Sequence, residues 1–101
     1  KSQGKTFEVA KKIYQDALIL QEAGVFSIVL ECVPYKLAGF IAKKLDIPVI
    51  GIGSGPDCDG QILVTHDLIG TFPWFTPRFV KPELNAGEQI RSAVKRWMQS
   101  L

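Results

Sequence analysis

The sequence is poor in side chains that bind metals or form disulfides. It has one histidine and two cysteines, Cys32 and Cys58, which lie far apart and outside any CxxC pair. This set is too small for a zinc site. We predict that both cysteines are buried or partly buried reduced thiols, which is typical of a reducing compartment and favours a cytoplasmic protein.

Long apolar runs and a strong excess of one charge are also absent. The longest apolar stretches are too short to span a bilayer, and the first residues show no secretory-signal pattern, so we expect no membrane association. The formal net charge is only +2 and the basic residues are scattered, so we expect no nucleic-acid binding. With 47% hydrophobic and 22% charged residues, the composition suits a globular domain or part of a larger one.

The sequence contains instead a succession of helix and strand patterns. Apolar residues recur at helical spacing between Thr6, a suitable N-cap, and Gly24, a suitable C-terminal cap. An apolar strand over residues 26–32 follows, then a helix opened by Pro34 as a first-turn proline, then an apolar strand over 49–52. This order with short connections predicts an α/β fold with a parallel sheet.

The second half of the sequence is less regular. Four glycines occupy residues 51–60, and a third strand is expected over 61–65. Too few residues precede that strand for a crossover helix, so a hairpin is also possible, and whether the two strands pair stays open. Residues 70–84 hold three of the six prolines and several aromatics, which predicts an irregular segment anchored by its rings.

A last helix follows, with Asn85 and Glu88 spaced as in a capping box. Its apolar residues share one face: Ile90, Val94, Trp97 and Leu101. The predicted helices and strands are too few to close a unit around a central strand, which indicates a piece of a larger domain.

Glu31 is the most informative single residue, because it lies near the end of the apolar strand 26–32. The C-terminal end of a parallel strand is where α/β sheets and barrels place their active sites. Such a strand is normally covered on both faces, so we expect the carboxylate to be partly buried. An unpartnered buried carboxylate is costly, and its position leaves both a structural and a functional role open.

The glycine-rich loop over residues 51–60 fits no nucleotide-binding motif. It lacks the third glycine of a dinucleotide fingerprint, and no Gly-Lys-Ser/Thr follows as in a P-loop. It could therefore be a structural turn or a loop that lines a site. Asp57 and Asp59 within it could suggest a metal site, but we expect local hydrogen bonds to the backbone.

Two further pairs of neighbours are weaker candidates. His66 beside Asp67 could be a base with an orienting acid, but adjacent strand residues rarely point the same way, which favours a satisfied histidine near a strand end. Trp74 and Phe75 could stack on a heterocycle, but we expect them to anchor their proline-rich segment.

Three ordered blocks of the sequence resemble the ketopantoate hydroxymethyltransferase family. They are GVFSIVLECVP at 24–34, IPVIGIGSG at 47–55 and DGQILVTHD at 59–67, and the resemblance extends over essentially the whole chain. It implies the C-terminal part of a (β/α)8 TIM barrel of the phosphoenolpyruvate/pyruvate type. Residues 1–101 would supply about strands 6–8 and the final helices of a single barrel domain whose N-terminal part is absent from this chain.

The resemblance also implies a reaction. A hydroxymethyl group passes from 5,10-methylenetetrahydrofolate to 3-methyl-2-oxobutanoate, giving 2-dehydropantoate for pantothenate biosynthesis. Glu31, in the block Leu-Glu-Cys-Val-Pro, is the one family catalytic residue that maps onto this chain, as the base that removes the proton beside the ketone. Burial would raise the pKa of such a base toward the working pH.

Cofactors and partners are implied in the same way. Mg²⁺ would hold the oxo acid through ligands in the N-terminal part, with none in this chain, and the residues that bind the folate are not identified. Small-molecule substrates and a homo-oligomer, typically a decamer in this family, are the expected partners. This chain alone is expected to be inactive. The alternatives are a non-catalytic barrel fragment that needs its N-terminal half, and another 2-oxo-acid enzyme of the same superfamily.

Overall fold

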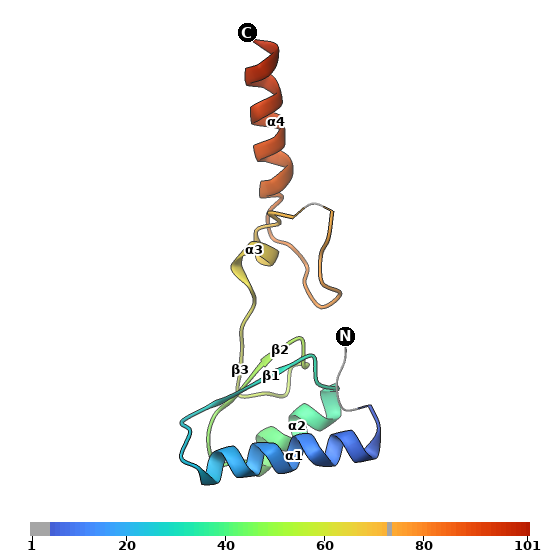
Figure 1. The fold of residues 1–101 in the computed structure, drawn as a ribbon, viewed down its shortest axis with the longest axis vertical. Coiled ribbons are helices and arrows are strands. Elements are labelled where there is room, and N and C mark those ends of the chain that lie inside the picture. The colour runs from blue at the N-terminus through green and yellow to red at the C-terminus, as the bar shows by residue number, and fades with distance from the viewer. Residues whose placement is uncertain (1–4, 73) are drawn as a thin grey trace. The chain divides into compact units, whose positions relative to one another are not determined.

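The computed structural model describes residues 5–72 and 74–101 of the chain. These form two compact units, Lys1–Ile62 and Leu63–Leu101 (Figure 1). The first unit contains a parallel sheet with two helices, and the second contains a short helix, an irregular segment and the last helix.

Helix α1 (Phe7–Glu22) begins and ends where the sequence places its capping residues. The Oγ1 atom of Thr6 accepts a hydrogen bond of 3.3 Å from the N–H of Val9, which satisfies one of the free donors of the first turn. Gly24 has a φ of +96°. Its N–H and that of the next residue donate back to carbonyls of the last turn, as in a Schellman motif. Both predicted ends are confirmed.

The sheet has three parallel strands in the order β1-β2-β3. They are β1 (Ile28–Glu31), β2 (Val49–Ile52) and β3 (Gly60–Gln61). Glu31 is in register with Ile52, so the first two strands end at the same edge. The predicted parallel sheet and β2 are confirmed, whereas the first strand is shorter than the predicted 26–32.

The predicted third strand over 61–65 is wrong in most of its length. The ladder with β2 contains residues 60–61, and Ile62 adds one bond from its N–H to the Gly51 carbonyl at 3.0 Å; the pairing is parallel, which excludes a hairpin. Asp59 occupies both backbone groups of Val49: its N–H donates to the Val49 carbonyl at 2.9 Å, and its Oδ2 accepts from the Val49 N–H at 2.7 Å. The seven-residue loop over 53–59 thus connects β2 to its parallel neighbour β3, and it contains no crossover helix.

Helix α2 (Tyr35–Lys44) connects β1 to β2. It begins one residue later than predicted, because Pro34 is its N-cap, with an extended ψ of 139°, and not its first-turn residue. The Pro34 carbonyl already accepts the first helical hydrogen bond, from the N–H of Ala38 at 2.9 Å.

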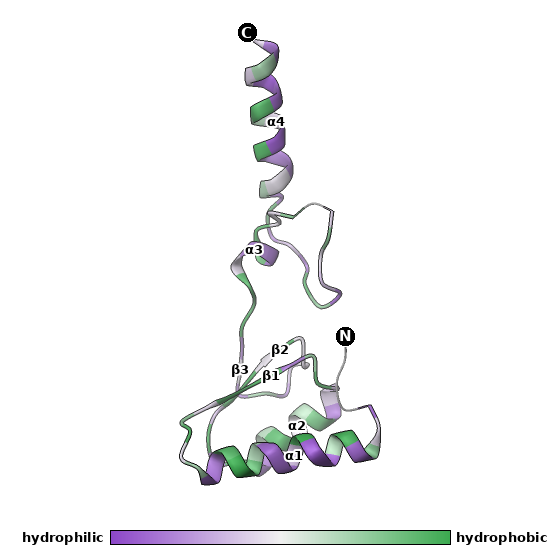
Figure 2. Cartoon of the chain, in the orientation of Figure 1, coloured by the Kyte–Doolittle hydropathy of each residue, from purple (hydrophilic) through white to green (hydrophobic). Residues whose placement is uncertain are grey.

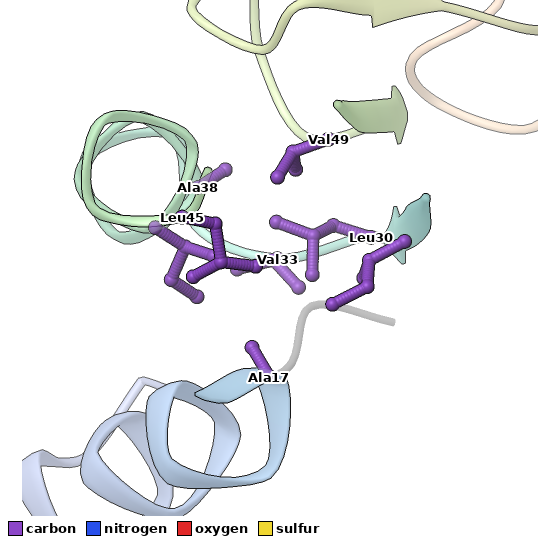
Figure 3. Close-up of a cluster of buried hydrophobic side chains, with 8 residues drawn as sticks. Ala17, Leu30, Val33, Ala38, Leu45 and Val49 are labelled. Atoms are coloured by element: carbon purple, nitrogen blue, oxygen red, sulfur yellow. The ribbon is translucent and has the colours of Figure 1, made fainter. Parts of the chain in front are cut away.

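The hydrophobic core lies between the sheet and the two helices, which cover the same face of it (Figure 1). Figure 3 shows side chains from α1, α2 and the strands converging there. The core residues are Ala17, Ile28, Leu30, Val33, Ala38, Ile41, Leu45 and Val49. Burying side chains of this kind stabilises a fold by roughly 1.5–3 kcal/mol for each large one. Burial alternates along β1, and Val29, on the other face, is 54% exposed.

The second unit begins with α3 (Thr65–Leu68) and ends with α4 (Ala86–Gln99). The segment between them is irregular, as predicted, in the residues that the structure describes; Pro73 lies outside these. Rings contact one another here, with Phe72 and Trp74 centroids 5.5 Å apart. Trp74 and Phe75 are 74% and 64% exposed, so they do not anchor the segment to the rest of this unit.

Helix α4 starts after Asn85, as predicted, but the predicted capping box is wrong. The Asn85 side chain makes no cap hydrogen bond. The N–H groups of Ala86 and Gly87 instead donate to the carbonyls of Ile69 and Gly70, at 2.9 and 2.8 Å. Backbone carbonyls thus satisfy first-turn donors that a side chain was expected to serve.

Apolar and hydrophilic residues alternate along α1 and α4, as expected of amphipathic helices (Figure 2). The predicted apolar face of α4 is exposed in this unit: Ile90, Val94, Trp97 and Leu101 are 58%, 51%, 63% and 85% exposed. No helix among the described residues combines the length and apolar character needed to cross a membrane.

Candidate functional site

Glu31 is the last residue of β1 and lies at the carboxyl-end edge of the parallel sheet. Ile28 and Leu30 point into the core, so by strand alternation the side chains of Val29 and Glu31 lie on the face away from α1 and α2. The structure thus places the predicted acid at the edge where parallel α/β proteins bind their ligands.

An open hollow of about 340 Å³ lies beside Glu31. No residue of β2 lines it, so it lies on the side of β1 away from the neighbouring strand. It is lined by Val9, Lys12, Ile13, Asp16, Val29, Leu30, Glu31 and Val33. The lining is largely apolar, with both signs of charge at its margin.

Glu31 has no ion-pair partner within the part of the chain that the structure describes. Lys12 is the cation among the residues that line the hollow, and its Nζ atom lies 3.5 Å from Asp16 on the next turn of α1. That pair is exposed and contributes little to stability. The Glu31 carboxylate is therefore not held in a structural salt bridge here.

The predicted partial burial of Glu31 is wrong for this unit, because its side chain is exposed. The physical reason is the placement of the helices. Both α1 and α2 pack on the opposite face of the sheet, and the described residues of this unit, 5–62, leave Val29 and Glu31 exposed on the other face.

The backbone turns sharply directly after Glu31. Cys32 has a φ of 52°, in the left-handed region that side-chain-bearing residues seldom adopt. Such a conformation costs on the order of 1–3 kcal/mol unless its surroundings hold it. One holding contact is the hydrogen bond of 2.9 Å from the Cys32 N–H to the carbonyl of Ile52 on β2.

Ser54 holds the same turn from the loop after β2. Its side chain is fully buried, and its hydroxyl donates to the Leu30 carbonyl at 2.8 Å. The same oxygen accepts from the N–H of Val33 at 3.0 Å. Ser54 was not among the site residues predicted from the sequence. The available signal was a lone hydroxyl between two glycines, directly after a strand predicted to neighbour the strand of Glu31.

Glycines of the loop have structural reasons to be glycine. A Cβ at Gly51 would lie 2.9 Å from the Sγ of Cys58, and one at Gly55, whose φ is +86°, would lie 2.5 Å from the ring of Tyr35. The loop therefore packs closely on the start of α2.

The remaining candidates from the sequence do not assemble into a site. The Asp59 side chain bonds to backbone, but to the N–H of Val49 on β2, 10 residues away, and not locally as predicted, and Asp57 packs against Gly39 of α2. His66 belongs to α3 and not to a strand end, where it was predicted, and its ring stacks on Phe72 with 6.1 Å between centroids. No group of three or more His, Cys, Asp or Glu side chains in residues 5–72 and 74–101 could hold a metal ion.

Both cysteines are free and partly buried, as predicted. Burial raises the pKa of the Cys58 thiol, and the negative charges of Asp59 and Asp57 raise it further. Cys58 is therefore a protonated packing residue at neutral pH and not an activated nucleophile.

An acid at the carboxyl edge of a parallel sheet, with helices packed on the opposite face, is an arrangement typical of α/β enzymes. Comparison with known sequences is more specific. The chain belongs to the ketopantoate hydroxymethyltransferase family, whose sequence model matches residues 1–101.

Three relatives illustrate the match, and each is named 3-methyl-2-oxobutanoate hydroxymethyltransferase. The Acetivibrio thermocellus protein is 64% identical over 101 residues, which are all of this chain and 36% of that protein. A Clostridium botulinum protein is 53% identical over 94% of this chain and 34% of its own length. The Syntrophus aciditrophicus protein is 50% identical over the whole chain and 37% of its own length. The chain thus spans little more than a third of these relatives.

Proposed function

We propose that this chain serves in a 3-methyl-2-oxobutanoate hydroxymethyltransferase of pantothenate biosynthesis. The observation that carries the proposal is the match of all 101 residues, at up to 64% identity, to relatives that share this one name. A different 2-oxo-acid enzyme of the same superfamily is not favoured, because the relatives named above agree in their reaction.

The proposed fold of the whole protein is a (β/α)8 barrel of the phosphoenolpyruvate/pyruvate type, with residues 1–101 as its C-terminal part, about strands 6–8 and the final helices. The parallel order β1-β2-β3 and the packing of α1 and α2 on one face support it. Such a barrel takes about 250 residues, which agrees with a chain that spans 36% of a relative. In a closed barrel the open face with Val29 and Glu31 would be the interior, which would bury the carboxylate.

Glu31 is proposed as the general base. Carbon 3 of 3-methyl-2-oxobutanoate carries one hydrogen beside the ketone, and removing it as a proton leaves an enolate whose carbon can form the new carbon–carbon bond. A carboxylate that is exposed on the open face of the sheet and has no ion pair among the described residues is free to accept that proton.

Mg²⁺ and 5,10-methylenetetrahydrofolate are proposed as metal and co-substrate on family grounds alone. The described residues offer no metal-binding cluster, so we place the Mg²⁺ ligands in the N-terminal part of the barrel and assign no step of this chain to the metal. A cytoplasmic homo-oligomer, a decamer as in the family, is proposed in the same way. The free cysteines and the exposed apolar residues of α4 are compatible with it.

The test follows exchange of the hydrogen at carbon 3 in D₂O by NMR, using the complete polypeptide that the gene encodes. Replacing Glu31 with Gln keeps the shape but removes the base, so we expect exchange to fall by about 100-fold or more. The matched control is Glu22→Gln, because Glu22 is an exposed glutamate at the far end of α1.

Two outcomes separate the parts of this proposal. Exchange at the wild-type rate in Glu31→Gln would remove Glu31 from the mechanism while leaving the reaction standing. Absence of both exchange and 2-dehydropantoate formation in the wild type would contradict the proposed function itself.

A further inference from the structure

The Ser54 hydroxyl makes two hydrogen bonds that lie on either side of Glu31 in the chain. It donates to the carbonyl of Leu30, the residue before Glu31, and accepts from the N–H of Val33, two residues after it. The Ser54 side chain is 0% exposed, so water does not compete for either bond. A third, longer contact of 3.5 Å joins its hydroxyl to the Ile52 carbonyl within its own loop.

These bonds act on the part of the backbone that sets the direction of the Glu31 side chain. The chain leaves β1 through the left-handed Cys32, a conformation that reverts unless neighbouring contacts hold it. The Cys32 N–H is held by Ile52 at 2.9 Å. Without the hydroxyl, the Leu30 carbonyl and the Val33 N–H would lose a buried partner on both sides of Glu31.

We propose that Ser54 is a positioning residue for Glu31, which it holds in the direction needed for proton removal. The proposal rests on the proposed function for its kinetic consequence. Ser54 touches only backbone atoms, so it acts through Glu31 and not on the substrate. A displacement of about 1 Å at a reacting group can cost up to about 100-fold in rate, so the loss of these bonds should be visible in catalysis.

The experiment compares Ser54→Ala, Glu31→Gln and the double variant in the complete polypeptide, by hydrogen exchange at carbon 3 of the oxo acid. Ser54→Ala is expected to lower the exchange rate by roughly 10- to 100-fold, with KM for the oxo acid nearly unchanged. In the Glu31→Gln background the same change should add less than about twofold, because a residue that acts through Glu31 has nothing left to position.

Ser27 supplies the matched control. It lies before β1, at the opposite end from Glu31, and its hydroxyl donates to the Pro48 carbonyl at 3.0 Å. Ser27→Ala removes a serine hydroxyl from the same strand pair and is expected to leave exchange at carbon 3 within about twofold of the wild type.

Three results would overturn the proposal. One is exchange at carbon 3 of the oxo acid at the wild-type rate in Ser54→Ala, together with a lowered Tm. Ser54 would then be a purely structural residue. Another is a double variant in which Ser54→Ala lowers the exchange rate at carbon 3 by as large a factor as it does when Glu31 is present. The third is unchanged protection of the Cys32 and Val33 amides against hydrogen exchange in Ser54→Ala, which is measurable even if the wild type proves inactive and the proposed function fails.

If Ser54→Ala does not fold, Ser54→Cys keeps the shape of the side chain, with a larger atom that is a much weaker donor and acceptor. An exchange rate at carbon 3 between those of the wild type and Glu31→Gln, with faster exchange of the Val33 amide, would support the proposal. Wild-type rates in both measurements would overturn it.

Discussion

Glu31 and Ser54 are coupled through four consecutive residues of backbone. The hydroxyl of Ser54 hydrogen-bonds to the backbone of residues 30 and 33. Between these residues, Glu31 ends β1 and Cys32 has a left-handed backbone conformation. Both residues lie at the edge where β1 and β2 end together. At this scale the candidate site consists of one exposed carboxylate on a tightly held turn.

Cys58 gives a residue-scale prediction about pH. Its thiol pKa is raised by burial and by Asp59 and Asp57, so we expect slow alkylation by iodoacetamide at pH 8. In a Cys32→Ser background, Asp57→Asn should speed alkylation of Cys58 at this pH, because it removes one of the charges that disfavour the thiolate. Asp16→Asn, on α1, is the control. Equal rates for Asp57→Asn and its parent would contradict this account.

The same raised pKa sets the sign of a stability effect. The folded chain holds the Cys58 proton to higher pH than the unfolded chain does. The free energy of unfolding should therefore be unaffected by this group below the ordinary thiol pKa and should fall as pH rises through and above it.

At the scale of elements, the two long amphipathic helices begin in different ways. The first turn of α1 uses a side chain, the Thr6 hydroxyl, whereas that of α4 uses backbone carbonyls of residues 69 and 70. The second arrangement needs the backbone at Leu84 to lie close to Gly70. Gly70 has a φ of +67°, and a Cβ there would overlap the Leu84 carbonyl. The two helices thus depend on different kinds of contact.

This difference predicts unequal costs for two cap substitutions. Thr6→Ala should lower the free energy of unfolding by about 1 kcal/mol, because it removes a hydrogen bond to the first turn of α1. Asn85→Ala should cost only a few tenths of a kcal/mol, because the Asn85 side chain makes no such bond. Urea denaturation followed by circular dichroism measures both. A larger loss for Asn85→Ala would contradict the backbone capping of α4.

At the scale of the whole molecule, many apolar side chains among the described residues are exposed within each unit. Val29 on the open face of the sheet is 54% exposed, and Trp97 on α4 is 63% exposed. Surfaces of this kind on a small chain normally belong to an interface or to a larger core. This fits the proposal that the chain works as part of a barrel in a protein of which it forms little more than a third.

The 101 residues produced alone are therefore expected to associate and to show no transferase activity. Size-exclusion chromatography with light scattering should report aggregates or oligomers, while circular dichroism still reports helix. The N-terminal part of the Acetivibrio thermocellus relative, added during refolding, should reduce this association by covering β1 and the open face. A stable, soluble monomer without any added partner would contradict the prediction.

The sequence by itself determined the features that depend on near neighbours. Thr6 and Gly24 mark the ends of α1 because caps act within one turn, and β2 follows from a short apolar run between Pro48 and the glycine loop. The acid at the end of β1 was also readable, because a strand and its last residue are adjacent in the chain.

Only the tertiary structure decided the rest, because it depends on contacts between distant segments. The Ser54 hydroxyl reaches residues 24 and 21 positions away, and Asp59 bonds both backbone groups of Val49, 10 residues before it. Glu31 is exposed because α1 and α2 pack on one and the same face of the sheet. Local patterns specify which segments are helix or strand, but the choice of face and partner is made when those segments pack.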